Sequence, residues 1–469
     1  MNVSTFLRHW SISENPFRAE EARHDPVFMR LGVGVTTHPD FDKILGDPAH
    51  PSTSIVFGEK GSGKTAIRLQ ISERIAEHNL RHPDSRVLLA PYDDLNPVLD
   101  RVCARQGVTL ESKAKDIVEA LRTFRLVDHM DAITASAVTS LTDAAIGGGT
   151  RASTLGDDVA RRLRRTSAPT KRDLVLLQAV YDSNQDPVRR AARLRRSIGA
   201  PVHWIGVLWK VVAAMGWLLP VAVWLGMMLR PAMLPDVFWQ AAFFTLSGAW
   251  ALVLLYVLGW QAWMTRRTAA RIARQMPAVG RSAGSIAASL AALAPGDRRS
   301  DVLPVTDSDE QRYAMFDRLR AVLLAMGCPG LIVVVDRVDE PTLVNGDPDR
   351  MRAIIWPMLH NKFLQQEGIG LKLLLPIELR HELFRESSVF FQEARLDKQS
   401  LVERLTWTGA MLYDLCNARL NACLEPNGER ISLGDLFEKD VTRQDIIDAL
   451  DQMHQPRDAF KLIYQCIQD

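Results

Sequence analysis

The sequence predicts an α/β protein in which a three-layer α/β/α domain with a parallel sheet is interrupted by a two-helix membrane hairpin and followed by a helical C-terminal part. Three observations predict it. A glycine-rich loop follows a short β-prone run near residue 58, and an acidic segment follows a buried apolar run near residue 335. Between them lie two long stretches without charged residues, 211–229 and 237–265, each long enough to cross a bilayer as a helix.

Composition excludes several classes of protein. The chain has 469 residues, more than one hydrophobic core usually serves, so two or three units are expected. Lys and Arg number 57 against 55 Asp and Glu, so the overall charge does not indicate a polyanionic partner. The five cysteines lack C-x-x-C spacing, which argues against a zinc site or a disulfide framework. Residues 1–10 lack the pattern of a secretory signal, so the globular part is expected in the cytoplasm.

The glycine-rich loop is the strongest motif. It lies between a predicted strand at 54–57 and a helical stretch at 66–76, and it fits the pattern G-x-x-x-x-G-K-T. Its residues, all expected to contact a nucleotide, are Gly58, Glu59, Lys60, Gly61, Ser62, Gly63, Lys64 and Thr65. Backbone N–H groups of such a P-loop hold phosphate oxygens. Lys64 is predicted to neutralise the β- and γ-phosphates, and the Thr65 hydroxyl to bind Mg²⁺.

The acidic segment is expected to act together with this loop in binding Mg²⁺ and in hydrolysis. Residues 331–335 read as a buried strand, and Asp336 follows at its carboxyl end, the edge at which parallel sheets bind ligands. Asp336 is expected to hold Mg²⁺ through water. Glu340 is the candidate base that polarises the attacking water, and its neighbour Asp339 is the alternative.

Two arginines are candidates for sensing the nucleotide. A predicted strand at 370–376 leads to Arg380, which either faces the γ-phosphate or lies on the surface. Pro456 opens a C-terminal helix, from which Arg457 either reaches the nucleotide or pairs with its neighbour Asp458. A further strand is predicted at 86–90, ending near Asp93 and Asp94. Ser308 is expected to cap a helix that runs to Met326, and a helical stretch is expected from Asp349 to Phe363.

The hairpin is oriented by its flanking arginines. Arginines cluster at 189–196 and at 266–274, whereas the turn at 230–236 carries one Arg and one Asp. The positive-inside rule therefore places both termini in the cytoplasm, as in a multi-pass protein of the cell inner membrane. A buried helical hairpin in a soluble core is the alternative. The basic run 161–172 favours lipid headgroups or a solvated face over nucleic acid.

The expected organisation has five parts. They are a leader (1–50), the first half of the nucleotide-binding domain (51–200), the membrane hairpin (201–265), a linker with the second half of the domain (266–400), and a C-terminal helical lid (401–469).

These motifs together resemble the KAP family of P-loop NTPases, which belong with the STAND and AAA+ ATPases. The resemblance rests on the 58–65 loop, the Asp336 to Glu340 segment and the two apolar stretches between them. It implies that a strand separates the strands that carry the two motifs, that Mg-ATP binds and is hydrolysed, and that the chain self-associates in a nucleotide-dependent way, in some members in defence against phage or plasmids. The leader Asn15-Pro16-Phe17 is similar to one in soluble bacterial P-loop ATPases, where it packs by the nucleotide.

The predicted function is thus a membrane-anchored ATPase that couples nucleotide state to self-association or conformational change. No guanine-reading N/T-K-x-D motif is found, so ATP is preferred to GTP by elimination. Two alternatives remain: a nucleotide-gated signalling scaffold with negligible hydrolysis, and a DNA-handling ATPase. The sequence identifies no protein partner.

Overall fold

The computed structural model describes residues 3–18, 21–32, 37–147, 155–201, 204–230, 237–298, 303–425 and 428–468. The chain divides into two compact units. The described parts of 1–126, 151–156 and 327–469 form the first, here the sheet unit, and those of 127–150 and 157–326 form the second, here the helical unit. Of the expected turn at 230–236, residues 231–236 lie outside the described residues.

The described residues of the sheet unit form a five-stranded parallel sheet in the order β2-β3-β4-β1-β5. Its strands are β1 (Ser54–Gly58), β2 (Val87–Tyr92), β3 (Gly330–Val335), β4 (Ile369–Pro376) and β5 (Ser400–Val402). β1, β3 and β4 are buried at every position, as expected for central parallel strands covered on both faces. The predicted α/β class with a parallel sheet is therefore confirmed.

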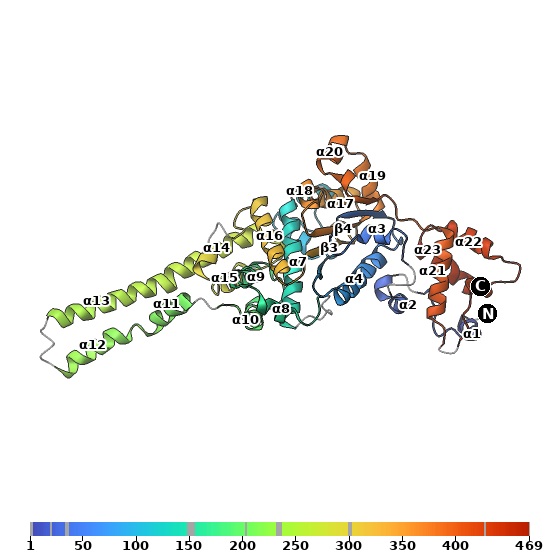
Figure 1. Ribbon diagram of the computed structural model, residues 1–469. Helices are drawn as coiled ribbons and strands as arrows, with labels where there is room; N and C mark the ends of the chain where they lie inside the picture. The colour runs from blue at the N-terminus through green and yellow to red at the C-terminus, as the bar shows by residue number, and fades with distance from the viewer. Residues whose placement is uncertain are drawn as a thin grey trace. The chain divides into compact units, whose positions relative to one another are not determined.

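Helices cover both faces of this sheet. Ile67, Ile71 and Ile75 of α4 (Lys64–Arg81) recur at helical spacing and pack with Phe41 and Ile44 of α3 against the strands. In Figure 1, α17 and α19 lie on the side of the sheet opposite α4. The helices of this part of the chain are α2 (Pro26–Leu31), α3 (Phe41–Leu45), α4, α5 (Asn96–Ala104), α6 (Ala114–Leu121), α17 (Pro348–Ile355), α18 (Asn361–Leu364), α19 (Ile377–Phe384) and α20 (Ser388–Glu393), with the 3-10 turns η1 (Ala22–His24), η6 (Trp356–Met358) and η7 (Leu396–Lys398).

The two ends of the chain share a second core within the sheet unit. Phe17 from the leader is buried with Trp407, Leu412 and Ile463 from the C-terminal part. A backbone bridge pairs Ile12 with Leu424 beside it. The elements of this core are α1 (Val3–His9), α21 (Gly409–Ala422), η8 (Leu433–Leu436), α22 (Arg443–Asp451) and α23 (Pro456–Gln468).

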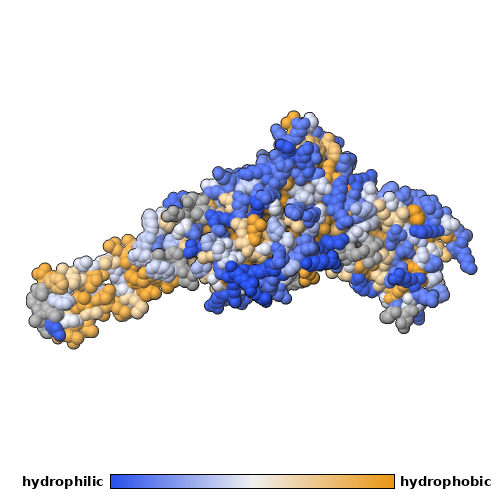
Figure 2. Space-filling model, in the orientation of Figure 1, coloured by the Kyte–Doolittle hydropathy of each residue, from blue (hydrophilic) through white to orange (hydrophobic). Residues whose placement is uncertain are grey.

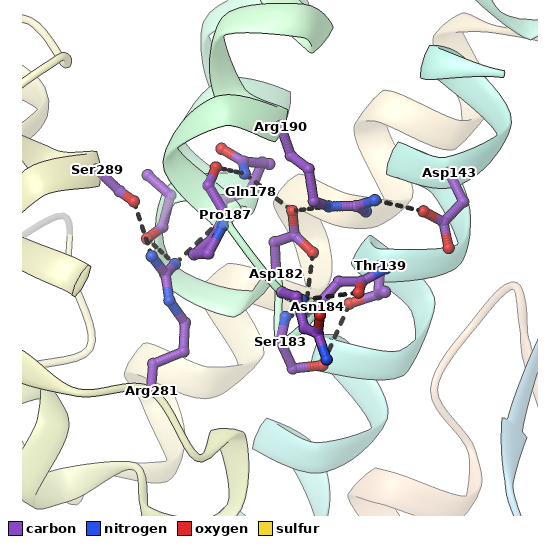
Figure 3. A network of polar contacts seen from close by, with 12 residues as sticks. Thr139, Asp143, Gln178, Asp182, Ser183, Asn184, Pro187, Arg190, Arg281 and Ser289 are labelled. Carbon is purple, nitrogen blue, oxygen red and sulfur yellow. Dashed lines mark hydrogen bonds and ion pairs between the residues drawn. The ribbon is translucent and has the colours of Figure 1, made fainter. Parts of the chain in front are cut away.

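The helical unit is held together by buried polar contacts. Arg190 of α10 donates to Asp182 at 2.8 Å and to Asp143 of α7 at 2.6 Å, and Gln178 of α9 donates to the same Asp182 carboxylate (Figure 3). Arg312 of α16 pairs with the fully buried Asp131 of α7 at 3.1 Å. The helices of this unit are α7 (Leu126–Ile146), α8 (Val159–Arg165), α9 (Ala168–Tyr181), α10 (Pro187–Ile198), α11 (Trp204–Met215), α12 (Leu218–Leu229), α13 (Val237–Leu254), the π-helix η3 (Leu255–Trp260), α14 (Gln261–Gln275), α15 (Ala283–Leu290) and α16 (Asp309–Ala325), with the 3-10 turns η4 (Pro277–Val279) and η5 (Pro295–Arg298).

Two helices of this unit, Gly206–Leu229 and Val237–Gln275, are long and apolar enough to cross a membrane. Only 17% of the most apolar window of the first is buried, and none of that of the second. Their surface is predominantly orange in Figure 2, where they form the arm labelled α11, α12 and α13 in Figure 1. Within the part 266–400, expected as a linker with the second half of the domain, α14 continues to Gln275 and α15 packs beside α9.

Candidate functional site

The 58–65 loop joins the end of β1 to the start of α4. Gly61 and Gly63 have φ angles of 104° and 98°, a region that residues with a Cβ rarely adopt. Lys64 and Thr65 are the first two residues of α4, so the loop ends on the N-terminus of a helix. Backbone N–H groups at a helix N-terminus attract anions, and this local structure suits a phosphate group.

Lys64 lies across the loop. Its Nζ donates to the carbonyl oxygens of Gly58 at 2.7 Å and Glu59 at 2.9 Å. Burial lowers the pKa of Lys64, and the charges of Asp339, Asp336 and Glu378 oppose that shift, Asp339 most strongly. The Lys64 side chain is therefore largely removed from water and within electrostatic range of three carboxylates.

The structure brings together the two residues predicted to hold Mg²⁺. The Thr65 hydroxyl lies 3.3 Å from the Asp336 carboxylate, although 271 positions separate them in the sequence. Asp336 follows β3 and is 1% exposed. Burial raises its pKa, and the Arg68 guanidinium is the main opposing charge.

Arg68 was not predicted from the sequence. It lies one turn after Thr65 on α4, with Nε 3.3 Å from Asp336 and Nη1 2.5 Å from Asp93 at the end of β2. It thus links two carboxylates that follow neighbouring strands. Its i+3 spacing from Thr65 was a usable signal, because residues at that spacing share a helix face.

The two candidate bases differ in their surroundings. Glu340 pairs with Arg337 at 3.1 Å, and its side chain is 51% exposed. Burial raises the pKa of Glu340, and Arg337 opposes the shift. Asp339 is less exposed and is the carboxylate that acts most on Lys64. Both line the same cavity as the loop, so both assignments stay open.

C-terminal residues close over the loop. A Cβ on Gly61 would meet Gln455 Oε1 at 2.9 Å and Arg457 Cβ at 3.0 Å, so α23 begins directly against the loop. Gln455 donates to the Glu59 carboxylate, to which Arg404 also binds at 2.5 Å. The Trp407 indole donates to the Ser62 carbonyl at 2.9 Å. Arg457 is thus beside the loop, whereas Arg380 pairs with Glu403 at 2.7 Å and stacks on Phe384.

Residues of the 58–65 loop, the segment after β3 and the start of α23 line a cavity of about 340 Å³. Its polar lining includes Lys64, Thr65, Asp336 and Asp339. Its apolar and aromatic lining includes Phe28, Leu31, Trp407, Leu415 and Phe460. A cavity lined by both kinds of side chain suits a ligand that joins a planar apolar group to a polyanion.

Arg419 lines the cavity and connects it to the leader. It is 2% exposed, donates to the Pro16 carbonyl at 2.8 Å, pairs with Asp25 at 2.6 Å and lies over the Phe460 ring. Its Nη2 is buried without a hydrogen-bond partner. No local pattern in the sequence points to Arg419, because Pro16 and Asp25 lie about 400 residues before it.

The described side chains do not by themselves form a complete metal-binding site. Within the described ranges, no group of three or more His, Cys, Asp or Glu side chains is placed to hold an ion. The oxygens of Thr65 and Asp336 are the donors that Mg²⁺ prefers, and Mg²⁺ usually takes only one or two protein carboxylates and completes its shell with water and phosphate. Comparison of the chain with family models, with curated proteins and with solved structures finds no match.

Proposed function

We propose that this chain is a membrane-anchored P-loop ATPase of the KAP family that binds and hydrolyses Mg-ATP in the cytoplasm. The observation that carries the proposal is the 3.3 Å contact between Thr65 and Asp336, which joins the 58–65 loop to the end of β3. The position of β4 between β1 and β3 supports it as well, since the resemblance implies a strand between these two.

The residues present fit a magnesium nucleotide. Among the described side chains, Ser62 Oγ and Arg457 Nε are buried at the loop and have no hydrogen-bond partner. Thr65 and Asp336 would hold Mg²⁺, and the ion would neutralise charge on the phosphates. An unpaired buried donor is costly, and a polyanion beside the loop would relieve that cost.

The protein's own groups would act through position and charge. Lys64 and Arg457 bind phosphate oxygens, and Asp339 or Glu340 orients the attacking water and accepts its proton. The aromatic side chains of the cavity lining would contact the nucleobase. ATP is proposed rather than GTP because the sequence lacks the guanine-reading motif.

The two apolar helices are proposed to span the inner membrane. Their exposure supports this, because a core hairpin of a soluble protein would be mostly buried. Arginines flanking both helices would keep the two termini in the cytoplasm. Nucleotide state would then control self-association or a conformational change at the membrane, in a role such as bacterial defence.

A nucleotide-gated scaffold with slow hydrolysis is the second candidate. The Arg337–Glu340 ion pair favours it, because one of the two possible bases is engaged by a neighbouring cation in this conformation. A hydrolytic enzyme must release or bypass that pair, whereas a switch can retain it until a partner binds.

Steady-state ATP hydrolysis by the detergent-purified protein tests the proposal. Lys64→Ala should abolish turnover and weaken ATP binding, because the variant lacks the cation of the loop. Glu340→Gln and Asp339→Asn should retain ATP binding, and the variant that loses turnover identifies the base. Lys115→Ala, an exposed lysine of α6 outside the cavity, is the matched control.

The outcomes separate the candidates. Turnover near 10 per second is typical of enzymes, whereas P-loop switches without an activator are far slower. Tight ATP binding with negligible turnover would favour the scaffold. Unchanged ATP binding in Lys64→Ala would contradict both.

A further inference from the structure

The helical unit contains a small cationic cavity that the proposed ATP chemistry does not use. It has a volume of about 50 Å³ and lies between α9, α10 and the segment after α15. Its lining includes Arg172, Arg195, Pro201, Ala292 and Asp297. A volume of about 10–15 Å³ suffices for one water, so the cavity accepts a group of about four oxygen-sized atoms, the size of a phosphate.

Arg195 is the unusual member of this lining. Its Nη2 donates to the Ala292 carbonyl at 2.6 Å, but its Nε is buried and has no hydrogen-bond partner. Burial lowers its pKa, and no described carboxylate counters that shift. A partly buried guanidinium that is not ion-paired with a described carboxylate is energetically costly, and an anion in the cavity would remove that cost.

The remaining charges leave the cavity positive. Arg172 is exposed on α9 and lines the same cavity, so it could add a second guanidinium to a bound anion. Asp297 is the one carboxylate of the lining, and its charge acts on its neighbour Arg298. The Arg298 guanidinium is held by the carbonyl oxygens of Ala291 and Leu293.

The cavity lies next to the first apolar helix. Ala200 and Pro201 line it, and the candidate span begins at Gly206. Trp204, between them, is 69% exposed, and Arg196 is exposed on α10. Arginines and tryptophans at the end of a membrane helix lie at headgroup level.

We propose that this cavity binds the phosphate of an anionic phospholipid, held by Arg195 and Arg172. The proposal rests on the membrane insertion proposed above and is independent of ATP hydrolysis. It assigns the helical unit a specific lipid contact in addition to the apolar surface of the hairpin. A free phosphate ion presents the same chemistry, and the experiment distinguishes the two.

The test uses the full-length protein, delipidated in a neutral detergent. Binding of dioctanoyl-phosphatidylglycerol, dioctanoyl-phosphatidylcholine and inorganic phosphate is measured by calorimetry for the parent and its variants. The anionic lipid should bind most tightly, and Arg195→Gln and Arg172→Gln should each weaken it about ten-fold or more, since each removes charge-assisted hydrogen bonds. Arg193→Gln, an exposed arginine on the same helix but outside the cavity, should leave binding unchanged.

Several results would overturn the proposal. If Arg193→Gln weakened lipid binding as much as the cavity variants, the effect would come from the overall positive charge and not from the cavity. Equal binding of the two lipids would mean that the site does not recognise the charge of the headgroup. Inorganic phosphate binding as tightly as the anionic lipid would reassign the cavity to a free ion. If Arg195→Gln does not fold, lipid binding by Arg172→Gln still tests the proposal, because Arg172 is exposed and its replacement should not affect folding. Lys64→Ala should bind the lipid like the parent, so loss of ATPase activity and loss of the lipid site are distinguishable.

Discussion

Asp336 is the residue on which the charges of the candidate nucleotide site converge. It is almost fully buried, its carboxylate contacts the Thr65 hydroxyl and the Arg68 guanidinium at 3.3 Å each, and Arg68 is itself held by Asp93. A buried carboxylate needs such a counter-charge, because desolvation favours its protonated form. Arg68 therefore opposes the rise in the pKa of Asp336 and favours its ionised form.

Arg68→Gln should lower the stability of the protein by about 3 kcal/mol or more near neutral pH, since it leaves a buried carboxylate unpaired. The pKa of Asp336, already raised by burial, should rise further. A raised carboxyl pKa means that the folded state binds the proton more tightly than the unfolded state. The loss of stability relative to the parent should therefore be greatest at pH 8. It should shrink as the pH falls through the pKa of Asp336 in the folded state.

Thermal unfolding in detergent at pH 8 and pH 5 measures this effect. Arg81→Gln is the matched control, because Arg81 lies on the same helix in an exposed pair with Glu77 and its loss should have little effect. Equal losses in the two variants, or a deficit that grows at low pH, would show that Arg68 does not compensate Asp336.

Arg337 provides a test of the base. Burial raises the pKa of Glu340 and the Arg337 guanidinium opposes that shift, so Arg337→Gln should raise the pKa further. A general base works only when deprotonated, so activity declines as the pH falls through its pKa. If Glu340 is the base, the acid limb of kcat/KM should move to higher pH in Arg337→Gln. An unmoved limb, with activity lost in Asp339→Asn, would assign the base to Asp339.

At the scale of elements, the sequence predicted those with strong local patterns. The structure confirms the strands around Ile55, Val333 and Leu373 within a residue or two at each end, and it confirms the Ser308 cap of α16. The helical stretch expected from Asp349 to Phe363 is broken at Trp356-Pro357, because proline lacks the backbone N–H that a helix needs.

Other features had no local signal. β5 is three residues long and half-buried at two of them, so neither length nor periodicity distinguishes it. The contacts of Trp407 and Gln455 with the loop depend on tertiary packing across hundreds of residues. The motif residues and Arg457 could thus be named as candidates from the sequence, whereas Trp407 and Gln455 could not.

The two long apolar helices pack closely against each other at Gly216. Pro220 has no N–H to offer the Gly216 carbonyl, and the helix is interrupted between α11 and α12. Trp250 of α13 packs against this break, and its indole donates to the Ala213 carbonyl at 3.0 Å. The second helix therefore satisfies a backbone group near the point where the first is interrupted.

Gly216→Ala should separate these helices. Its Cβ would lie 2.5 Å from the Val212 carbonyl oxygen and 2.7 Å from Trp250 Cδ1, distances at which atoms must move. Overpacking of this kind costs about 1–3 kcal/mol, so the melting temperature of the protein in detergent should fall. Gly226→Ala is the control on the same span, where a Cβ meets nothing within 4 Å. Equal melting temperatures for the two variants would mean that the Trp250 contact is not formed.

At the scale of the molecule, the helical unit is an insertion in the sheet unit. The chain forms β1 and β2, continues through the helical unit from 127 to 326, interrupted by the short segment 151–156, and then returns to form β3, β4 and β5. The candidate nucleotide site combines Thr65 from before the insertion with Asp336 from after it. Each group of the candidate site lies in the sheet unit, so ATP binding should not need the apolar hairpin.

Replacing residues 202–264 with a short Gly/Ser linker tests this separation. The variant loses the exposed apolar helices but keeps α10, most of α14 and the polar contacts of Arg312 and Arg281 that hold the helical unit together. It should be monodisperse without detergent, because the removed surface is apolar and largely unburied. It should bind ATP within a few-fold of the parent in an equilibrium assay, and the same deletion combined with Lys64→Ala should not. An aggregated or unfolded product would mean that the hairpin belongs to the core of the protein, and loss of ATP binding by a folded product would mean that the membrane segment shapes the site.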